Sequence, residues 1–110
     1  MFRSQLPSVD AAAVPADAIL LDVRENDEWA AGHAQNAVHI PMSEITARVA
    51  EVPEGDRVHV VCRVGGRSAQ VTQYLIAQGI DAVNVNGGML DWEAAGRPVV
   101  DGNGGDGYIL

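Results

Sequence analysis

Cys62 is the only cysteine of the chain, and it stands at the end of a run rich in β-branched residues. Arg63 follows it directly, and Arg67 opens a segment with helical character. A thiol placed between a strand end, a helix start and two arginines should have its pKa lowered from ~8.5 toward roughly 3.5–7.5, which favours the reactive thiolate. Gly65 and Gly66 allow the backbone to turn several N–H groups inward around an anion. The pattern predicts a nucleophilic sulfur with an anionic guest.

Short apolar runs along the chain predict strands, and the clearest of them leads into Cys62. Residues 57–61 end at the cysteine, and residues 18–23 are almost continuously apolar, as expected for a parallel strand buried on both faces. Further strands are predicted at residues 37–40 and 82–85 and, as a short first strand, at residues 6–9.

Amphipathic segments between these runs predict helices. Residues 67–78 follow the cysteine loop, and residues 24–31 end before Gly32, with Arg24 and Glu28 spaced to form a pair. Other helices are predicted at residues 43–52 with Ser43 as N-cap, at residues 89–95, and as one turn capped by Asp10.

The alternation of strands and helices predicts an α/β fold with a mainly parallel sheet. Ligands of such sheets bind outside the carboxyl ends of the strands, and Cys62 lies at such an end. The fold and the thiol therefore indicate the same site. We expect one domain over residues 1–100, followed by a glycine-rich, mobile tail at residues 101–110.

The bulk composition is that of a small globular domain, since 47% of the 110 residues are hydrophobic. A net charge of −8 argues against nucleic acid or an anionic membrane surface as a partner. One cysteine excludes an internal disulfide. The N-terminus lacks the apolar core of a signal peptide, and no run approaches the ~18 apolar residues of a membrane span. We expect a cytoplasmic protein.

Three separated blocks of the sequence resemble the rhodanese superfamily, and in particular its small single-domain sulfurtransferases. They occur in the order of the family and span nearly all of residues 18–100. The blocks are LLDVRE with EW and GH at residues 20–33, CRVGGRS at residues 62–68, and NGGMLDW with GRP at residues 86–98. One departure is HAQNA at residues 33–37, where the family often has HIPGA; it should affect the shape of that turn more than the chemistry.

The resemblance implies a rhodanese-like three-layer α/β/α domain with a five-stranded, mainly parallel sheet. It also implies that Cys62 takes a sulfane sulfur from a donor such as thiosulfate, becomes a persulfide, and passes the sulfur to cyanide, a thiol or an acceptor protein. The acceptor must be external because the chain has no second cysteine. Neither a cofactor nor a metal is expected. The substrate-binding residues implied by the resemblance form the loop after the cysteine: Arg63, Val64, Gly65, Gly66, Arg67 and Ser68.

Within this loop we expect Arg67 to steady the loop and its anion, and Arg63 to steer the anionic donor at the rim. Val64 should project near the mouth and influence the choice of acceptor.

Other functions stay open for such a loop. A persulfide carrier would deliver sulfur to one protein, and a rhodanese-like binding module would do no chemistry, although such modules tend to have lost the cysteine or the loop arginine. Phosphatases and arsenate reductases of the same fold have five residues between these two positions, whereas four separate Cys62 from Arg67. The smaller ring suits a single sulfur atom better than a phosphate.

The remaining polar and aromatic residues with chemical potential are expected to be structural. Asp22 and Arg24 should hydrogen-bond a strand end. His33, His39 and His59 lack metal-ligand spacing, and His59 lies within a strand, where it should not reach the loop. Trp29 and Trp92 are expected to anchor the core.

Overall fold

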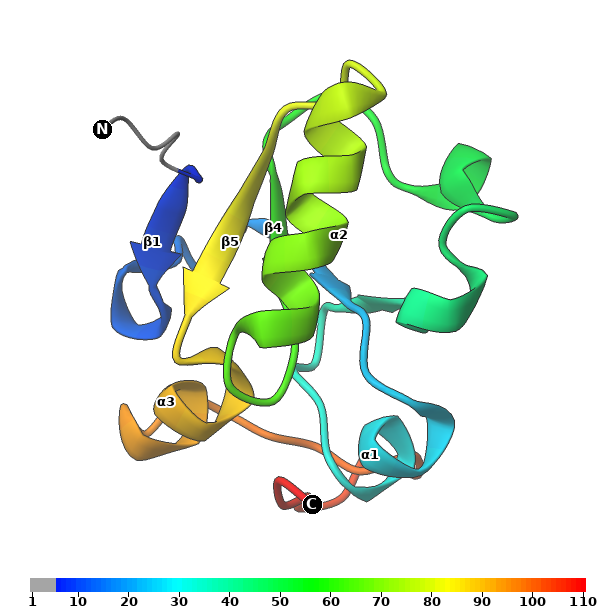
Figure 1. The fold of residues 1–110 in the computed structure, drawn as a ribbon. Helices are drawn as coiled ribbons and strands as arrows, with labels where there is room; N and C mark the ends of the chain where they lie inside the picture. Colours follow the sequence, from blue (N-terminus) through cyan, green and yellow to red (C-terminus); the bar gives the residue numbers. More distant parts are fainter. Residues whose placement is uncertain (1–5) are drawn as a thin grey trace.

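A parallel sheet forms the centre of the computed structural model, which describes residues 6–110 (Figure 1). Its strand order is β1-β5-β4-β2-β3, and every paired neighbour runs parallel. The five strands are β1 (Ser8–Asp10), β2 (Ile19–Asp22), β3 (Val38–His39), β4 (Val58–Val61) and β5 (Ala82–Asn86). The predicted α/β class and the mainly parallel sheet are confirmed, and each predicted strand is present with small shifts at its ends.

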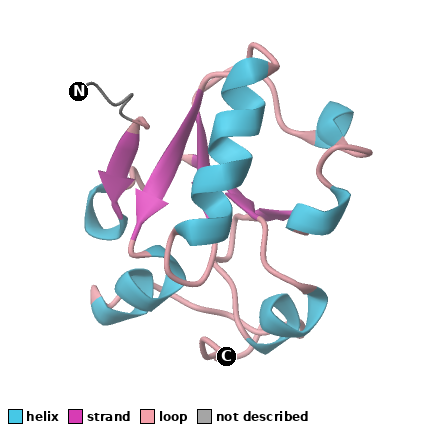
Figure 2. Ribbon diagram, viewed as in Figure 1, coloured by secondary structure: helices cyan, strands magenta, loops and turns pink. Residues whose placement is uncertain are grey.

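Helices connect the strands (Figure 2). The α-helices are α1 (Asn26–Ala31), α2 (Gly66–Ala77) and α3 (Gly88–Ala94), and the 3₁₀-helices are η1 (Ala11–Ala13), η2 (Met42–Glu44) and η3 (Val49–Glu51). Within residues 6–110, no helix has both the length and the apolar character needed to cross a membrane.

Side chains alternate between the two faces of the sheet, and each face has its own apolar cluster. The cluster on the α2 face includes Val58, Val60, Cys62, Val71 and Leu75. The cluster on the α3 face includes Leu20, Val61, Val85, Met89 and Trp92. Full burial of an aliphatic side chain contributes about 1.5–3 kcal/mol, so both faces hold their helices firmly. The alternation also directs Cys62 toward α2.

α1 begins with a capping box between Glu25 and Glu28. Its end at Gly32 was predicted. The predicted pair of Arg24 and Glu28 is wrong. Arg24 is fully buried, and its Nη2 donates to the Asp22 carboxylate over 2.8 Å and to the Gly32 carbonyl over 2.6 Å. A guanidinium without water needs a carboxylate beside it, and Asp22, also fully buried, supplies one. The pair ties the end of β2 to the end of α1.

The helix predicted over residues 43–52 is wrong, because the segment forms η2 and η3 with turns between them. Four β-branched residues lie in it and crowd a helical turn. Arg48, with φ −118° and ψ 18°, interrupts the helix, and Ser43 lies inside η2 without capping it. The two short turns still bury Ile45 and Val52.

Asp10 stands at the N-cap position of η1, as predicted, but its side chain makes no capping bond. Its carboxylate instead accepts a hydrogen bond of 3.3 Å from the Asn86 amide. Asp10 therefore links β1 to β5 at their carboxyl ends.

The glycine-rich C-terminal segment is hydrogen-bonded to the rest of the protein, where a mobile tail was expected. Val100 and His33 exchange backbone hydrogen bonds of 2.8 and 2.9 Å, and the Tyr108 N–H donates to the Ala31 carbonyl over 3.0 Å. The Asp101 carboxylate accepts the N–H groups of Asn103 and Gly105, which closes a tight turn. Composition alone did not reveal that these glycines serve a turn.

His59 generates a prediction about stability. Burial lowers its pKa, and backbone hydrogen bonds with Arg57 and Ile19 oppose this only in part. Below the ordinary histidine value of ~6.5 the unfolded chain therefore binds a proton that the folded imidazole does not, so stability is present above that pH and is lost as pH falls. The His59→Val variant should show a flatter pH dependence of the unfolding free energy around pH ~6, measured by urea titration. Parallel curves for the two proteins would contradict this.

Candidate active site

The Cys62 thiol lies at the carboxyl end of β4 and is enclosed by its own loop, with only 1% of the residue exposed. The Gly65 N–H donates to Sγ over 3.1 Å, and the Ser68 hydroxyl donates over 3.3 Å. A buried cysteine without such donors would be a small core hydrophobe. Donors directed at the sulfur favour a charged sulfur instead. The loop of residues 62–68 therefore suits a charged sulfur.

Opposing effects set the pKa of Cys62. Burial raises the pKa, because an ionised thiol loses its hydration. The Ser68 hydroxyl and the amides of Ser68, Gly65 and Val64 lower the pKa. Together they outweigh burial, so the pKa lies below its ordinary value. The loop thus increases the thiolate fraction mainly through hydrogen-bond donors.

Glycines give the loop its conformation. Gly65 has a φ of +112°, in the left-handed region where side chains are strained, and it caps the start of α2. The Asn84 amide, from β5, donates to the Gly65 carbonyl over 3.3 Å and holds this turn. A Cβ at Gly66 would meet nothing within 4 Å, so the outer side of the loop is open there.

The first turn of α3 supports the base of the same loop. The N–H groups of Met89 and Leu90 donate to the carbonyls of Cys62 and Arg63 over 2.8 and 3.1 Å. Gly88 makes this approach possible, because a Cβ there would collide with those same two carbonyls. The start of α3 therefore lies directly against the Cys62 loop.

Arg67 pairs with Glu28 of α1. Its Nη1 and Nη2 donate to the two Glu28 carboxylate oxygens over 2.6 and 2.9 Å. These bonds hold the pKa of Glu28 down at about 2, and the carboxylate raises the pKa of Arg67. The Cys62 charge also acts on Arg67. Arg67 therefore joins the loop to α1 while remaining electrostatically coupled to the sulfur.

Arg63 and Val64 lie on the outside of the loop. Val64 is 56% exposed, which fits a residue at the mouth of the site. Arg63 is exposed, and its Nε donates to the Leu110 carbonyl over 3.0 Å. Leu110 thus reaches the Cys62 loop.

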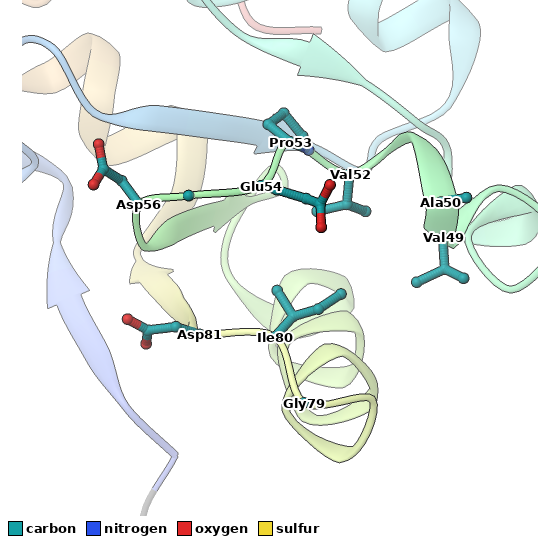
Figure 3. Close-up of a pocket in the computed structure, with 10 residues that line it drawn as sticks. Val49, Ala50, Val52, Pro53, Glu54, Asp56, Gly79, Ile80 and Asp81 are labelled. Carbon is teal, nitrogen blue, oxygen red and sulfur yellow. The ribbon is translucent and has the colours of Figure 1, made fainter.

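Two hollows lie away from the Cys62 loop. The larger, with a volume of about 480 Å³, lies between residues 49–56 and residues 79–81 (Figure 3). It adjoins the start of β4, whereas the thiol follows the end of that strand. The smaller, of about 190 Å³, is lined by residues that include Trp92 and Arg97. Neither hollow is lined by a residue of the Cys62 loop. The volume of a hollow therefore does not indicate the candidate site in this protein.

The comparison with known proteins agrees with the geometry. Residues 8–95 match the family model described as a rhodanese-like domain. A sulfurtransferase of Allochromatium vinosum is 39% identical over 85 residues, which are 76% of this chain and 79% of that protein. The chain belongs to the rhodanese-like domain family.

Further relatives share the rhodanese sequence and fold. Thiosulfate sulfurtransferase GlpE of Actinobacillus pleuropneumoniae serotype 3 is 35% identical over 83 residues, 74% of this chain and 77% of that protein. The crystal structure of a rhodanese-related protein from Thermoplasma volcanium matches with a TM-score of 0.80 at 33% identity, covering 86% of this chain and 97% of that chain.

Two residues that support the Cys62 loop, Asn84 and Glu28, were not predicted from the sequence. Asn84 lies in the apolar strand predicted over residues 82–85, and an amide side chain in such a strand indicates a local hydrogen-bonding partner. Glu28 was paired with the wrong arginine. Its true partner is 39 positions away, so helical spacing could not find it.

Two of the three histidines of the chain pack against Trp29. His33 and His39 stack on the two faces of Trp29, and their ring centroids lie 3.6 and 4.6 Å from that of Trp29. Trp29 is therefore half-buried between two imidazole rings and is not the core anchor that was predicted. Trp92 is buried as predicted. Within residues 6–110, no cluster of three metal-ligating side chains is placed to hold a metal ion.

Removing the Ser68 hydroxyl should raise the pKa of Cys62, because one of the donors that offset burial is lost. The Ser68→Ala variant should shift the pH profile of alkylation by iodoacetamide toward higher pH. Ser43→Ala, at an exposed position, is the control and should leave the profile in place. Superimposable profiles for wild type and Ser68→Ala would refute the role of this hydroxyl.

Gly88→Ala should change the reactivity of Cys62, because the new Cβ would displace the Cys62 and Arg63 carbonyls at the base of the loop. Gly96→Ala is the matched control, because both glycines have a positive φ (57° and 76°) but a Cβ at Gly96 would meet nothing within 4 Å. The control should lose only the about 1–2 kcal/mol of left-handed strain. Gly88→Ala should lose more unfolding free energy and also change the alkylation rate of Cys62. Equal effects of the two substitutions would show that the close approach does not matter.

Proposed function

We propose that this protein is a sulfurtransferase that carries a sulfane sulfur on Cys62 as a persulfide. The observation that carries the proposal is the set of donors on Sγ, from Gly65 and Ser68, at the end of a parallel strand. The thiosulfate sulfurtransferase among the relatives supports thiosulfate as the class of donor. The lone cysteine needs no oxidising compartment, which supports a cytoplasmic location.

In the first step the Cys62 thiolate attacks the outer sulfur of thiosulfate. A new S–S bond forms at Sγ, the S–S bond of thiosulfate breaks, and sulfite leaves with the electron pair. The persulfide then carries the negative charge on its outer sulfur. Amides and a hydroxyl that already point at the loop centre stabilise this charge without having to reorganise.

In the second step an external nucleophile attacks the outer sulfur. Cyanide leaves as thiocyanate, or a thiolate leaves as a new persulfide, and the electron pair of the broken S–S bond returns to Sγ of Cys62. The chain has one cysteine, so a resolving thiol must come from the acceptor, either a small molecule or a protein. The regenerated thiolate meets the same donors as before.

The size of the loop favours sulfur over phosphate. Four residues separate Cys62 from Arg67, and the Arg67 guanidinium is occupied by Glu28. A phosphate group needs donors for three oxygens, while a persulfide adds one atom. The enclosed Sγ fits the smaller guest.

Intact-mass measurement tests the proposal. After incubation with thiosulfate and removal of excess reagent, the wild type should gain the mass of one sulfur atom, and cyanide or dithiothreitol should remove it. Cys62→Ser, which preserves size and polarity, should gain nothing. An unchanged mass of the folded wild type would contradict the proposal, and Cys62-dependent hydrolysis of an aryl phosphate would favour the phosphatase reaction instead.

A further inference from the structure

Residues 106–110 extend to the Cys62 loop, where Leu110 contacts Arg63. The family match stops at residue 95, and the chain continues to residue 110. In Figure 1 this continuation runs from α3 toward α1 and ends beneath the loop that precedes α2. We call residues 106–110 the C-terminal strap.

Backbone hydrogen bonds fix the strap to the end of α1. The Tyr108 N–H donates to the Ala31 carbonyl over 3.0 Å, and the Gly107 N–H donates to the Val99 carbonyl over 3.0 Å. Val100, which pairs with His33 on one side, also forms a bridge with Asp106 of the strap. The strap is therefore held through its main chain and through Ile109, which packs against the apolar cluster on the α3 face. The Tyr108 side chain, in contrast, is 59% exposed.

Gly32 permits this attachment. Its φ of 177° is extended backbone that any residue adopts, so conformation does not demand glycine there. A Cβ would, however, collide with the Tyr108 carbonyl oxygen and lie 2.6 Å from the Tyr108 nitrogen and 2.7 Å from Val99 Cγ1. The strap occupies the space of a side chain at position 32.

The far end of the strap holds an arginine of the active loop. The Leu110 carbonyl accepts the Arg63 Nε–H over 3.0 Å, and Arg63 directly follows the nucleophile. Within residues 6–110, the Arg63 side chain makes no other hydrogen bond. Its two terminal nitrogens are left to bind an anion, and a guanidinium presents them as a planar fork that suits paired oxygens.

We propose that the C-terminal strap is part of the active site: by holding Arg63 through Leu110, it directs the free end of the guanidinium toward the anionic oxygens of the sulfur donor. Gly32 acts as a positioning residue, because it gives the strap its seat on α1. The inference rests on the proposed function, since it names the binding group for the anionic half of the donor. It assigns this task to a segment beyond the residues that the family model matches.

The test compares two reagents that alkylate Cys62, the iodoacetate anion and neutral iodoacetamide. The ratio of their rate constants reports positive charge at the thiol, and a general loss of stability would change both rates together. Arg63→Gln should lower the ratio roughly threefold to tenfold, the effect of one partly exposed charge. Gly32→Ala should lower the ratio in the same direction, because the displaced strap no longer holds Arg63.

Gly102→Ala is the matched control for Gly32→Ala. Gly102 also bonds to α1, through the Ala30 carbonyl, but a Cβ there would be in ordinary contact at 3.9 Å. It should keep the wild-type ratio. Gly107→Ala is a second strap variant for the case that Gly32→Ala does not fold, because its Cβ would come within 2.7 Å of the Val100 carbonyl. It should also lower the ratio.

A wild-type ratio in Arg63→Gln, or in a folded strap variant, would overturn the inference. The mass gain of the wild type with thiosulfate is measured separately. A mass gain together with an unchanged ratio would reject the strap alone, and a missing mass gain would reject the proposed function, whatever the ratio.

Discussion

The whole site depends on hydrogen-bond donors that converge on a sulfur from which water has been removed. Burial by itself would keep Cys62 a neutral thiol, because a charge without hydration is costly. The Gly65 amide and the Ser68 hydroxyl reverse this, and they act more strongly in an enclosed site than they would in water. Burial of the sulfur and the hydrogen bonds to it therefore act together, because burial strengthens each hydrogen bond.

The scaffold fixes these donors from three sides. β5 holds the Gly65 carbonyl through Asn84, the turn at Gly88 brings two N–H groups to the base of the loop, and α1 holds Arg67 through Glu28. α1 is in turn tied to the sheet by the buried pair of Asp22 and Arg24. The fold itself thus fixes the loop, as the electrostatic stabilisation proposed for the persulfide requires.

The sequence predicted the features that follow local rules. The strands, the helix after the cysteine and the place of Cys62 at a strand end come from apolar periodicity and glycine positions. The ion pairs were predicted wrongly, because their partners are distant in sequence or compete for one side chain. Arg24 pairs with the nearby Asp22, and Arg67 pairs with Glu28, which is 39 positions away. The helix predicted at residues 43–52 is absent. The prediction relied on the helical spacing of apolar residues and gave too little weight to the crowding of β-branched side chains. The hydrogen bonds of the C-terminal segment were not predicted, because a high glycine content is typical of mobile segments and of tight turns alike.

The most direct test of the account is the ionisation of Cys62 in the intact protein. The ultraviolet absorbance of the thiolate, followed across pH in the wild type with Cys62→Ser as the blank, gives its pKa. The account predicts a midpoint below the ~8.5 of a free cysteine. A midpoint at or above that value would show that burial prevails over the donors and would contradict the central claim.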